Sequence, residues 1–310
     1  MSRFFRSLPN KLSDHRTNQI NIGPLSDAPP EWAPAPGNTH YYGKINEAPG
    51  KEYDDAERFC EVVPLNPPRL LPSDAVDKIN QFGCVAWGIE IPTSPRFVGI
   101  ILSPNDSKNV SKVVTVQTGR ECKDVCIFSS MPIMAGLYGI QGKTGVYYEI
   151  CINRMDGIIA IGTACKPYPE WRLPGWNRMS AGFHLDDFCK FFEDADGGRD
   201  YTNDMKQIRS GDIVGCGYEF QTGSLFFTYN GVQLPPAFTG IYLPRHAQDV
   251  FAAIGVEGHC NFQVNFGAEL FRWKEGNEWA WRVEGHVGRL TGDPSNFDDE
   301  LPSYQQARFS

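Results

Sequence analysis

Long apolar runs are missing from this 310-residue sequence, since none approaches the roughly 18 residues that a transmembrane helix requires. The first residues also lack the apolar core of a signal peptide. Positive charge is scarce, because 29 lysines and arginines stand against 37 aspartates and glutamates, a net charge of −8. Such a chain offers no general basic field to nucleic acid. We therefore expect a cytoplasmic protein that binds no nucleic acid and does not insert directly into a membrane.

Motifs that carry catalysis or hold a cofactor are equally scarce. The nucleophile pattern G-x-S-x-G is absent, and residues 142–144 resemble the end of a phosphate-binding loop whose first glycine is replaced by Leu137. Residues 184–187 combine a histidine with two carboxylates but have no partner cluster, so we expect a turn with surface carboxylates. Residues 194–200 resemble the start of a calcium loop, but its closing position holds Met205 instead of glutamate. These gaps predict a non-enzymatic protein without a metal or another cofactor.

The nine cysteines do not form a disulfide pattern. Their number is odd, and many lie in apolar segments, as Cys84 and Cys151 do, which is typical of buried free thiols in a reducing compartment. Cys122 and Cys126 have C-x3-C spacing, but no second Cys/His pair at zinc-finger spacing accompanies them. The cysteines therefore favour an intracellular protein and argue against a structural zinc site.

The sequence does contain a series of short β segments, rich in aromatic and β-branched residues and separated by glycine. No long amphipathic helix separates them, which argues against a parallel βαβ arrangement. We predict an all-β chain that folds as a two-sheet antiparallel β-sandwich. Asn-Gly at 230–231 is a type I′ hairpin signal and predicts that the strands on either side pair. The most informative segments are residues 147–152, 158–162, 173–184, 211–218, 224–231 and 264–267.

This pattern predicts one folded domain between two polar ends. The expected parts are a disordered or loosely attached arm at residues 1–60, an extended lead-in at 61–79, the sandwich at 80–273 and a flexible tail at 274–310. Within the arm, residues 54–59 favour a short helix. In the lead-in, Ser73 is suited to cap a helical turn.

The succession of segments resembles the SPRY domain, the concanavalin A-like β-sandwich core of the B30.2 type. The resemblance covers about residues 80–273 and is most specific from 147 to 267. It implies an antiparallel sandwich that binds other proteins through its loops and catalyses no reaction. The motifs that carry it are, in order, Y-Y-E-I, I-A-I-G-T-A, L-P-G-W-N-R-M-S-A-G-F-H, G-D-I-V-G-C-G-Y-E-F, G-S-L-F-F-T-Y-N-G and V-N-F-G.

A narrower resemblance concerns residues 166–169 (K-P-Y-P) and 173–178 (L-P-G-W-N-R). They are similar to fungal endosomal and vacuolar SPRY proteins that serve as adaptors for HECT ubiquitin ligases with WW domains. The resemblance implies that this chain links target membrane proteins to such a ligase, at the periphery of endosomal or vacuolar membranes. Leu301, Pro302 and Tyr304 form an L-P-x-Y variant of the P-P-x-Y ligand that WW domains bind in an extended conformation. Leucine in place of the first proline is expected to weaken this binding.

Trp171, Arg172, Trp176, Asn177 and Arg178 lie in a long loop between predicted strands. Binding surfaces on a sandwich concentrate in its loops, and large aromatic residues and arginine anchor many interfaces. We predict that these five residues contact the target protein. The alternative is that Trp176 packs inward while Asn177 and Arg178 tie the loop to the backbone, and the sequence leaves both open.

Two other functions also stay open. The chain is alternatively a scaffold subunit of another ubiquitin-ligase complex or of a chromatin complex, in which residues 301–304 are incidental. A lectin-like carbohydrate binder has the same architecture, and the glycosylation sequons at Asn105 and Asn109 suit a secreted protein. The missing signal peptide and the free thiols argue against that third function.

Overall fold

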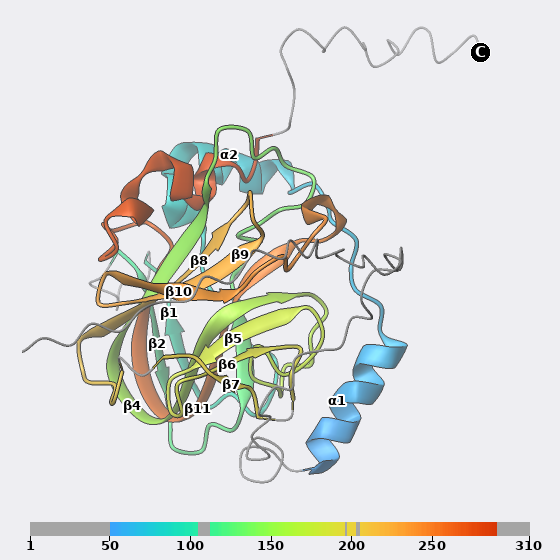
Figure 1. Ribbon diagram of the computed structural model, residues 1–310, viewed down its shortest axis with the longest axis vertical. Coiled ribbons are helices and arrows are strands. Elements are labelled where there is room, and N and C mark those ends of the chain that lie inside the picture. Colours follow the sequence, from blue (N-terminus) through green and yellow to red (C-terminus); the bar gives the residue numbers. More distant parts are fainter. Residues whose placement is uncertain (1–49, 105–111, 196, 203–204, 290–310) are drawn as a thin grey trace, which may run out of the picture. The chain divides into compact units, whose positions relative to one another are not determined.

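The computed structural model describes residues 50–104, 112–195, 197–202 and 205–289, which form an antiparallel β-sandwich and confirm the predicted fold class (Figure 1). The strands are β1 (Gly99–Leu102), β2 (Val114–Thr118), β3 (Val125–Phe128), β4 (Gly145–Cys165), β5 (Ser180–His184), β6 (Cys189–Phe192), β7 (Arg199–Asp200), β8 (Asp212–Glu219), β9 (Ser224–Tyr229), β10 (Val232–Phe238) and β11 (Val250–Asn265). The α-helices are α1 (Gly50–Val62) and α2 (Ser73–Phe82), and 3-10 turns span Gly83–Ala86, Arg245–Ala247, Glu275–Asn277, Trp279–Trp281 and Val283–Gly285.

Strands β4 and β11 form a long antiparallel ribbon that both layers share. The first part of β4 pairs with β8 and its last part with β5, while β11 pairs first with β3 and then with β2. The segments predicted as two strands at 147–152 and 158–162 are therefore one strand. The sequence suggests a break because the middle of β4 is exposed and polar and the ladder shifts by one residue opposite Asn261.

The main core lies on the inner face of this ribbon. Alternate apolar residues of both strands are buried there, among them Ile150, Ile161, Ile254 and Val264, each at most 1% exposed. Because side chains alternate between the two faces of a strand, the intervening residues point outward. Other segments of the chain cover the outward-facing side of each layer. Most of β4 and β11 is therefore buried on both sides.

Residues 271–287 cover one outer face, although the sequence analysis places everything after 273 in a flexible tail. Phe271 and Trp273 pack against Tyr147 and Phe226, and Val283 is fully buried. The prediction fails for residues 274–289 because their buried side chains are separated by polar ones in short 3-10 turns, so no regular apolar period marks them. The rest of the predicted tail lies outside the described residues.

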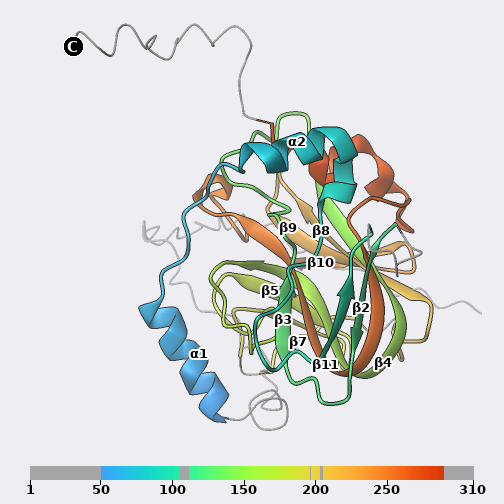
Figure 2. The same cartoon turned by 180° about the vertical axis from the view of Figure 1, so that it is seen from behind.

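The N-terminal helices differ in how they attach. Helix α2 buries Ile79 in the main core, close to the turn at Val283–Gly285, whereas α1 stands at the side of the sandwich (Figure 2). Ser73 is the first residue of α2 and not its cap, because Pro72 occupies the capping position without a side-chain hydrogen bond. Residues 50–60 of the predicted arm belong to α1, and its earlier residues lie outside the described part. Among the described residues, no helix is long and apolar enough to cross a bilayer.

Candidate functional site

A loop of residues 166–179 joins β4 to β5 and covers the other outer face of the sandwich. The strands beneath it carry small residues there, so that the loop backbone comes close. A Cβ atom added to Gly182 would lie 2.1 Å from the carbonyl oxygen of Pro174, and one added to Gly255 would lie 2.7 Å from the Pro174 ring. In the I-A-I-G-T-A segment at 159–164, the isoleucines therefore face the main core, while the alanines and the glycine face the loop.

Hydrogen bonds inside the loop fix its path. The Tyr168 hydroxyl donates to the carbonyl oxygen of Leu173 at 2.6 Å and accepts from the amide of Asn177 at 3.3 Å. The Ser180 hydroxyl donates to the Asn177 carbonyl at 2.5 Å and accepts from the amide of Gly175 at 2.9 Å. Gly175 has φ = +97°, a conformation that residues with a Cβ rarely adopt. The loop is therefore a rigid platform and does not need a ligand to order it.

Trp176 packs inward, which is the alternative that the sequence analysis left open. Its side chain is 2% exposed, and its ring centroid lies 5.5 Å from that of His184 on β5. His184 is also buried: its Nε2 donates to the Pro174 carbonyl at 3.0 Å, and burial lowers its pKa to about 4. Trp176 therefore supports the loop from beneath, together with Leu173 and Phe191.

Arg172 and Asn177 form a second layer above Trp176. The Arg172 guanidinium carbon lies 4.3 Å from the centroid of the Trp176 ring, and its Nε donates to Asn177 Oδ1 at 3.0 Å. Both residues are 2% exposed, and burial lowers the pKa of Arg172 from its ordinary value. A stacked guanidinium retains its directional donors, so it can receive a carboxylate from above.

Helix α1 supplies hydrogen-bond acceptors to the side chains of this loop. Trp171 Nε1 donates to the Glu52 carbonyl at 3.1 Å, Asn177 Nδ2 donates to Glu57 Oε1 at 2.8 Å, and Arg178 Nη1 donates to the Cys60 carbonyl at 2.6 Å. Four of the five predicted partner-binding residues thus lie together, with α1 above three of them.

Arg96 extends the same surface from the chain segment before β1. Its guanidinium donates to both carboxylate oxygens of Glu52, at 2.9 and 3.1 Å, and its Nε donates to the Asp124 carbonyl at 2.9 Å. Burial raises the pKa of Asp124 to about 7, and the nearby Glu257 adds to the rise. We define the arginine–tryptophan face as Arg96, Trp171, Arg172, Asn177 and Arg178.

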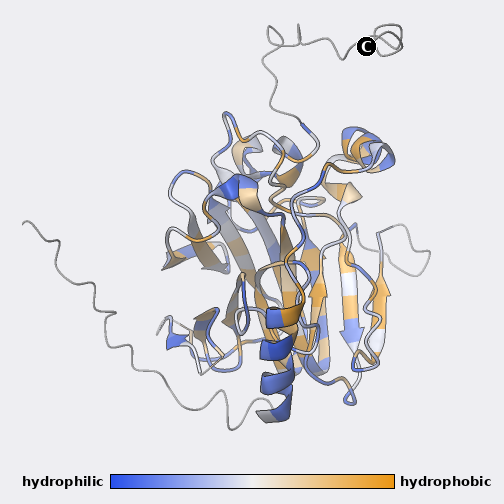
Figure 3. Ribbon diagram, turned by 90° about the vertical axis from the view of Figure 1, so that its right-hand side faces the viewer, coloured by the Kyte–Doolittle hydropathy of each residue, from blue (hydrophilic) through white to orange (hydrophobic). Residues whose placement is uncertain are grey.

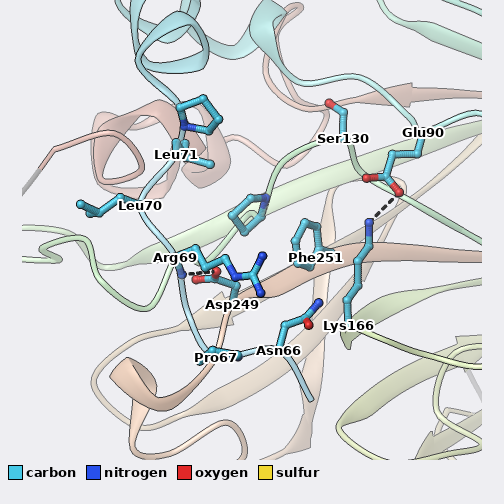
Figure 4. A pocket seen from close by; sticks show the side chains of 12 residues that line it. Asn66, Pro67, Arg69, Leu70, Leu71, Glu90, Ser130, Lys166, Asp249 and Phe251 are labelled. Atoms are coloured by element: carbon cyan, nitrogen blue, oxygen red, sulfur yellow. Dashed lines mark hydrogen bonds and ion pairs between the residues drawn. The ribbon is translucent and has the colours of Figure 1, made fainter. Parts of the chain in front are cut away.

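A separate groove of about 350 Å³ lies between the sandwich and the linker, which we define as residues 63–72 (Figure 4). Phe251 of β11 lies in it, and Lys166 Nζ is 4.3 Å from the centroid of that ring and 2.6 Å from Glu90 Oε2. The linker forms one wall, where the amide of Arg69 donates to Asp249 at 2.9 Å. The groove therefore lies where the linker, which holds α1 near the arginine–tryptophan face, crosses the sandwich.

The model of the SPRY domain family matches residues 145–269. The chain contains a SPRY domain. The match covers β4 to β11 and therefore includes the loop at 166–179. A SPRY domain is a protein-interaction module, in agreement with the predicted kind of function.

Several curated proteins are similar to this chain over its SPRY domain and beyond. Protein ssh4 of Sclerotinia sclerotiorum is 29% identical over 78% of this chain and 42% of its own length. A SPRY domain-containing protein of Schizosaccharomyces pombe is 33% identical over 56% of this chain and 42% of its own length. The chain thus spans about two fifths of each of these relatives. A human SPRY domain of known structure is 25% identical over 55% of this chain and 97% of that domain, with a TM-score of 0.39.

One member of the arginine–tryptophan face, Arg96, carries no signal in the sequence. Arg96 lies in a turn before β1 and no motif marks it, because its partners Glu52 and Asp124 are distant in sequence.

The other residues singled out in the sequence do not belong to the arginine–tryptophan face. Asp186 and Asp187 are exposed in the turn between β5 and β6, while Leu301, Pro302 and Tyr304 lie outside the described residues. Within the described ranges, no three His, Cys, Asp or Glu side chains gather as a potential metal site.

Proposed function

We propose that this protein is a non-catalytic adaptor that links a target membrane protein to a WW-domain HECT ubiquitin ligase. The SPRY domain binds the target through the arginine–tryptophan face. The segment with Leu301, Pro302 and Tyr304 binds the ligase. In this role the protein works in the cytoplasm, at the periphery of endosomal or vacuolar membranes.

The observation that carries the target-binding half is the gathering of Trp171, Arg172, Asn177 and Arg178 on a rigid platform. Aromatic side chains and arginines held in fixed positions are the groups that dominate binding energy in protein interfaces.

The ligase-binding half is supported by the L-P-S-Y sequence at 301–304. A WW domain places a proline against an aromatic groove and a tyrosine in a second pocket, and the ligand must be extended. Pro302 and Tyr304 have the spacing that this mode requires. Leu301 occupies the position of the first proline, where it costs affinity without removing either anchor.

Replacing Tyr304 with alanine is expected to weaken binding of a WW-domain ligase by at least about tenfold, which equals about 1.4 kcal/mol. The substitution empties the tyrosine pocket of the WW domain, while the SPRY domain keeps its thermal unfolding midpoint. Isothermal titration of the purified full chain with a WW-domain fragment of a HECT ligase measures the affinity.

Two substitutions in the same motif serve as matched controls. Ser303→Ala changes the position that the WW domain does not read and should leave the affinity unchanged. Leu301→Pro restores the usual first proline and should strengthen binding. If Tyr304→Ala binds as well as the unmodified chain, the motif is incidental, and the scaffold role in another complex becomes the better account.

A further inference from the structure

Helix α1 is an amphipathic acidic helix. Its inward residues follow the i, i+4, i+7 spacing of a helix face: Glu52, then the fully buried Ala56, then Phe59. The Phe59 ring meets the Trp171 ring edge to face, at 5.8 Å between centroids. Five of its side chains are acidic and two are basic, and its visible side in Figure 3 is largely hydrophilic. The helix therefore carries negative charge to a face that contains three arginines.

The contacts of α1 are those of a bound ligand and differ from those of a core element. Ala56 is its only buried residue, and none of its residues joins a hydrophobic cluster of the described sandwich. Its contacts with the face include the Glu52–Arg96 ion pair, three other hydrogen bonds and the Phe59–Trp171 ring contact. The rings of Tyr53 and Phe59 also lie 6.0 Å from the guanidinium groups of Arg172 and Arg178. Partly exposed ion pairs contribute little to folding stability. Removing α1 would thus leave the core of the SPRY domain closed.

The linker keeps α1 close without fixing it to the face. It contains four prolines and no regular secondary structure. Its backbone is attached to the sandwich through the amides of Asn66, Arg69 and Leu71, which donate to Lys166, Asp249 and Tyr138. The last of these backbone hydrogen bonds before α1 is at Asn66, and Leu65 packs against the main core beside it. The helix can therefore swing away about residues 63–64 while the linker stays in place.

The arginine–tryptophan face has more binding capacity than α1 uses. Among the described residues, Arg172 Nη1, Trp176 Nε1 and Arg178 Nε are buried and have no hydrogen-bond partner. A hollow of about 330 Å³ between α1 and the loop is lined by Trp176, Arg178 and Glu57, and also by the acidic residues Glu193 and Asp194. Glu193 already accepts a hydrogen bond from the amide of Met179 at 2.5 Å. Trp176 and Arg178 line this hollow, so a ligand that places a hydrogen-bond acceptor in it would pair donors that α1 leaves unpaired.

We infer that the arginine–tryptophan face is a docking site for an acidic amphipathic helix of a partner protein, and that α1 occupies it until such a helix displaces it. The partner helix has a carboxylate, a small residue four positions later and an aromatic residue three positions after that. Recognition is of the helix-in-groove kind, in which side chains at helical spacing supply the anchors. This inference deepens the proposed function, because it states which kind of target segment the SPRY domain receives.

Competition by α1 should lower the apparent affinity of the arginine–tryptophan face for an external helix. When a binding site is free for only a fraction of the time, the apparent affinity for an external ligand falls by that fraction. Substitutions in α1 that oppose docking should therefore raise the affinity for an external helix. Ala56→Arg introduces a long side chain where no space exists, and Glu52→Arg places a positive charge against Arg96.

The test uses a fluorescein-labelled peptide of residues 50–63 and the full-length chain, with binding followed by fluorescence anisotropy. We expect Ala56→Arg and Glu52→Arg chains to bind the peptide at least about tenfold tighter than the unmodified chain. Adding Trp171→Ala and Arg178→Ala to either chain should abolish that binding. A peptide with lysine at positions 52 and 57 should not bind.

Two results would overturn the inference. In the first, neither α1 variant binds the peptide, so that the face does not receive an acidic helix. In the second, the unmodified chain binds as tightly as the variants, so that α1 does not occupy the face. Both variants retain Tyr304, and WW-domain binding measured on the same preparations shows separately whether the ligase half of the proposed function holds.

Discussion

Replacing Trp176 with alanine should lower the free energy of unfolding by about 3–5 kcal/mol, the usual cost of removing a large buried aromatic side chain. The ring is 2% exposed and lies between the Arg172 guanidinium and His184. Its removal leaves a cavity under the loop and takes away the surface on which Arg172 stacks. We therefore expect both a less stable domain and a face that no longer holds its arginines in position.

Denaturant unfolding of the purified chain measures this effect, and Trp171 provides a matched control. Trp171 is half-buried and contacts α1 through its ring and its indole N–H. Trp171→Ala should change the unfolding free energy by less than about 1 kcal/mol, because it lies outside the hydrophobic clusters. Equal losses for the two variants would show that the distinction between platform and binding residue is wrong.

Protonation of His184 should destabilise the domain by about 3 kcal/mol between pH 7 and pH 4. Burial lowers the pKa of His184 to about 4, whereas an unfolded histidine titrates near 6.5. Between these values the unfolded chain binds a proton that the folded chain does not, so stability falls as the pH decreases. The neutral ring donates to the Pro174 carbonyl, which ties β5 to the loop.

The comparison of two variants isolates this effect from other titrating groups. Chemical denaturation at several pH values between 4 and 7 gives the pH dependence for the unmodified chain and for His184→Gln. The glutamine variant should have a shallower pH dependence across this range, whatever its stability at pH 7. An unchanged slope in His184→Gln would contradict a neutral buried histidine.

Local chemistry made much of the sandwich predictable. Asn230 and Gly231 both have positive φ, as a type I′ turn requires, and β9 pairs with β10 across them. The β segments at 147–152 and 158–162 were also readable, because strand periodicity is set by neighbouring residues, although the structure joins them into β4. By contrast, the start of the region predicted as sandwich at 80–273 forms a 3-10 turn at Gly83–Ala86, which is followed by Trp87, whose indole donates to the carbonyl of Pro132.

The candidate site was only partly predictable, because its decisive contacts join distant segments. The sequence indicated the loop residues Trp171 to Arg178 but left the direction of Trp176 open. It did not reveal that α1 covers them, since the contacts of Glu52 with Arg96 and Trp171 span 44 and 119 residues. Non-local contacts of this kind depend on how the sandwich places the loop, the turn before β1 and the linker.

Amide hydrogen exchange on the full chain tests most directly whether α1 is a displaceable ligand on the arginine–tryptophan face. We predict that the amides of residues 50–62 exchange through a local opening, much faster than those of β4 and β11. Glu52→Arg should accelerate exchange in α1 further and leave the strands unaffected. Exchange of α1 at the rate of β4 and β11, unchanged by Glu52→Arg, would instead show that the helix is an integral part of the fold.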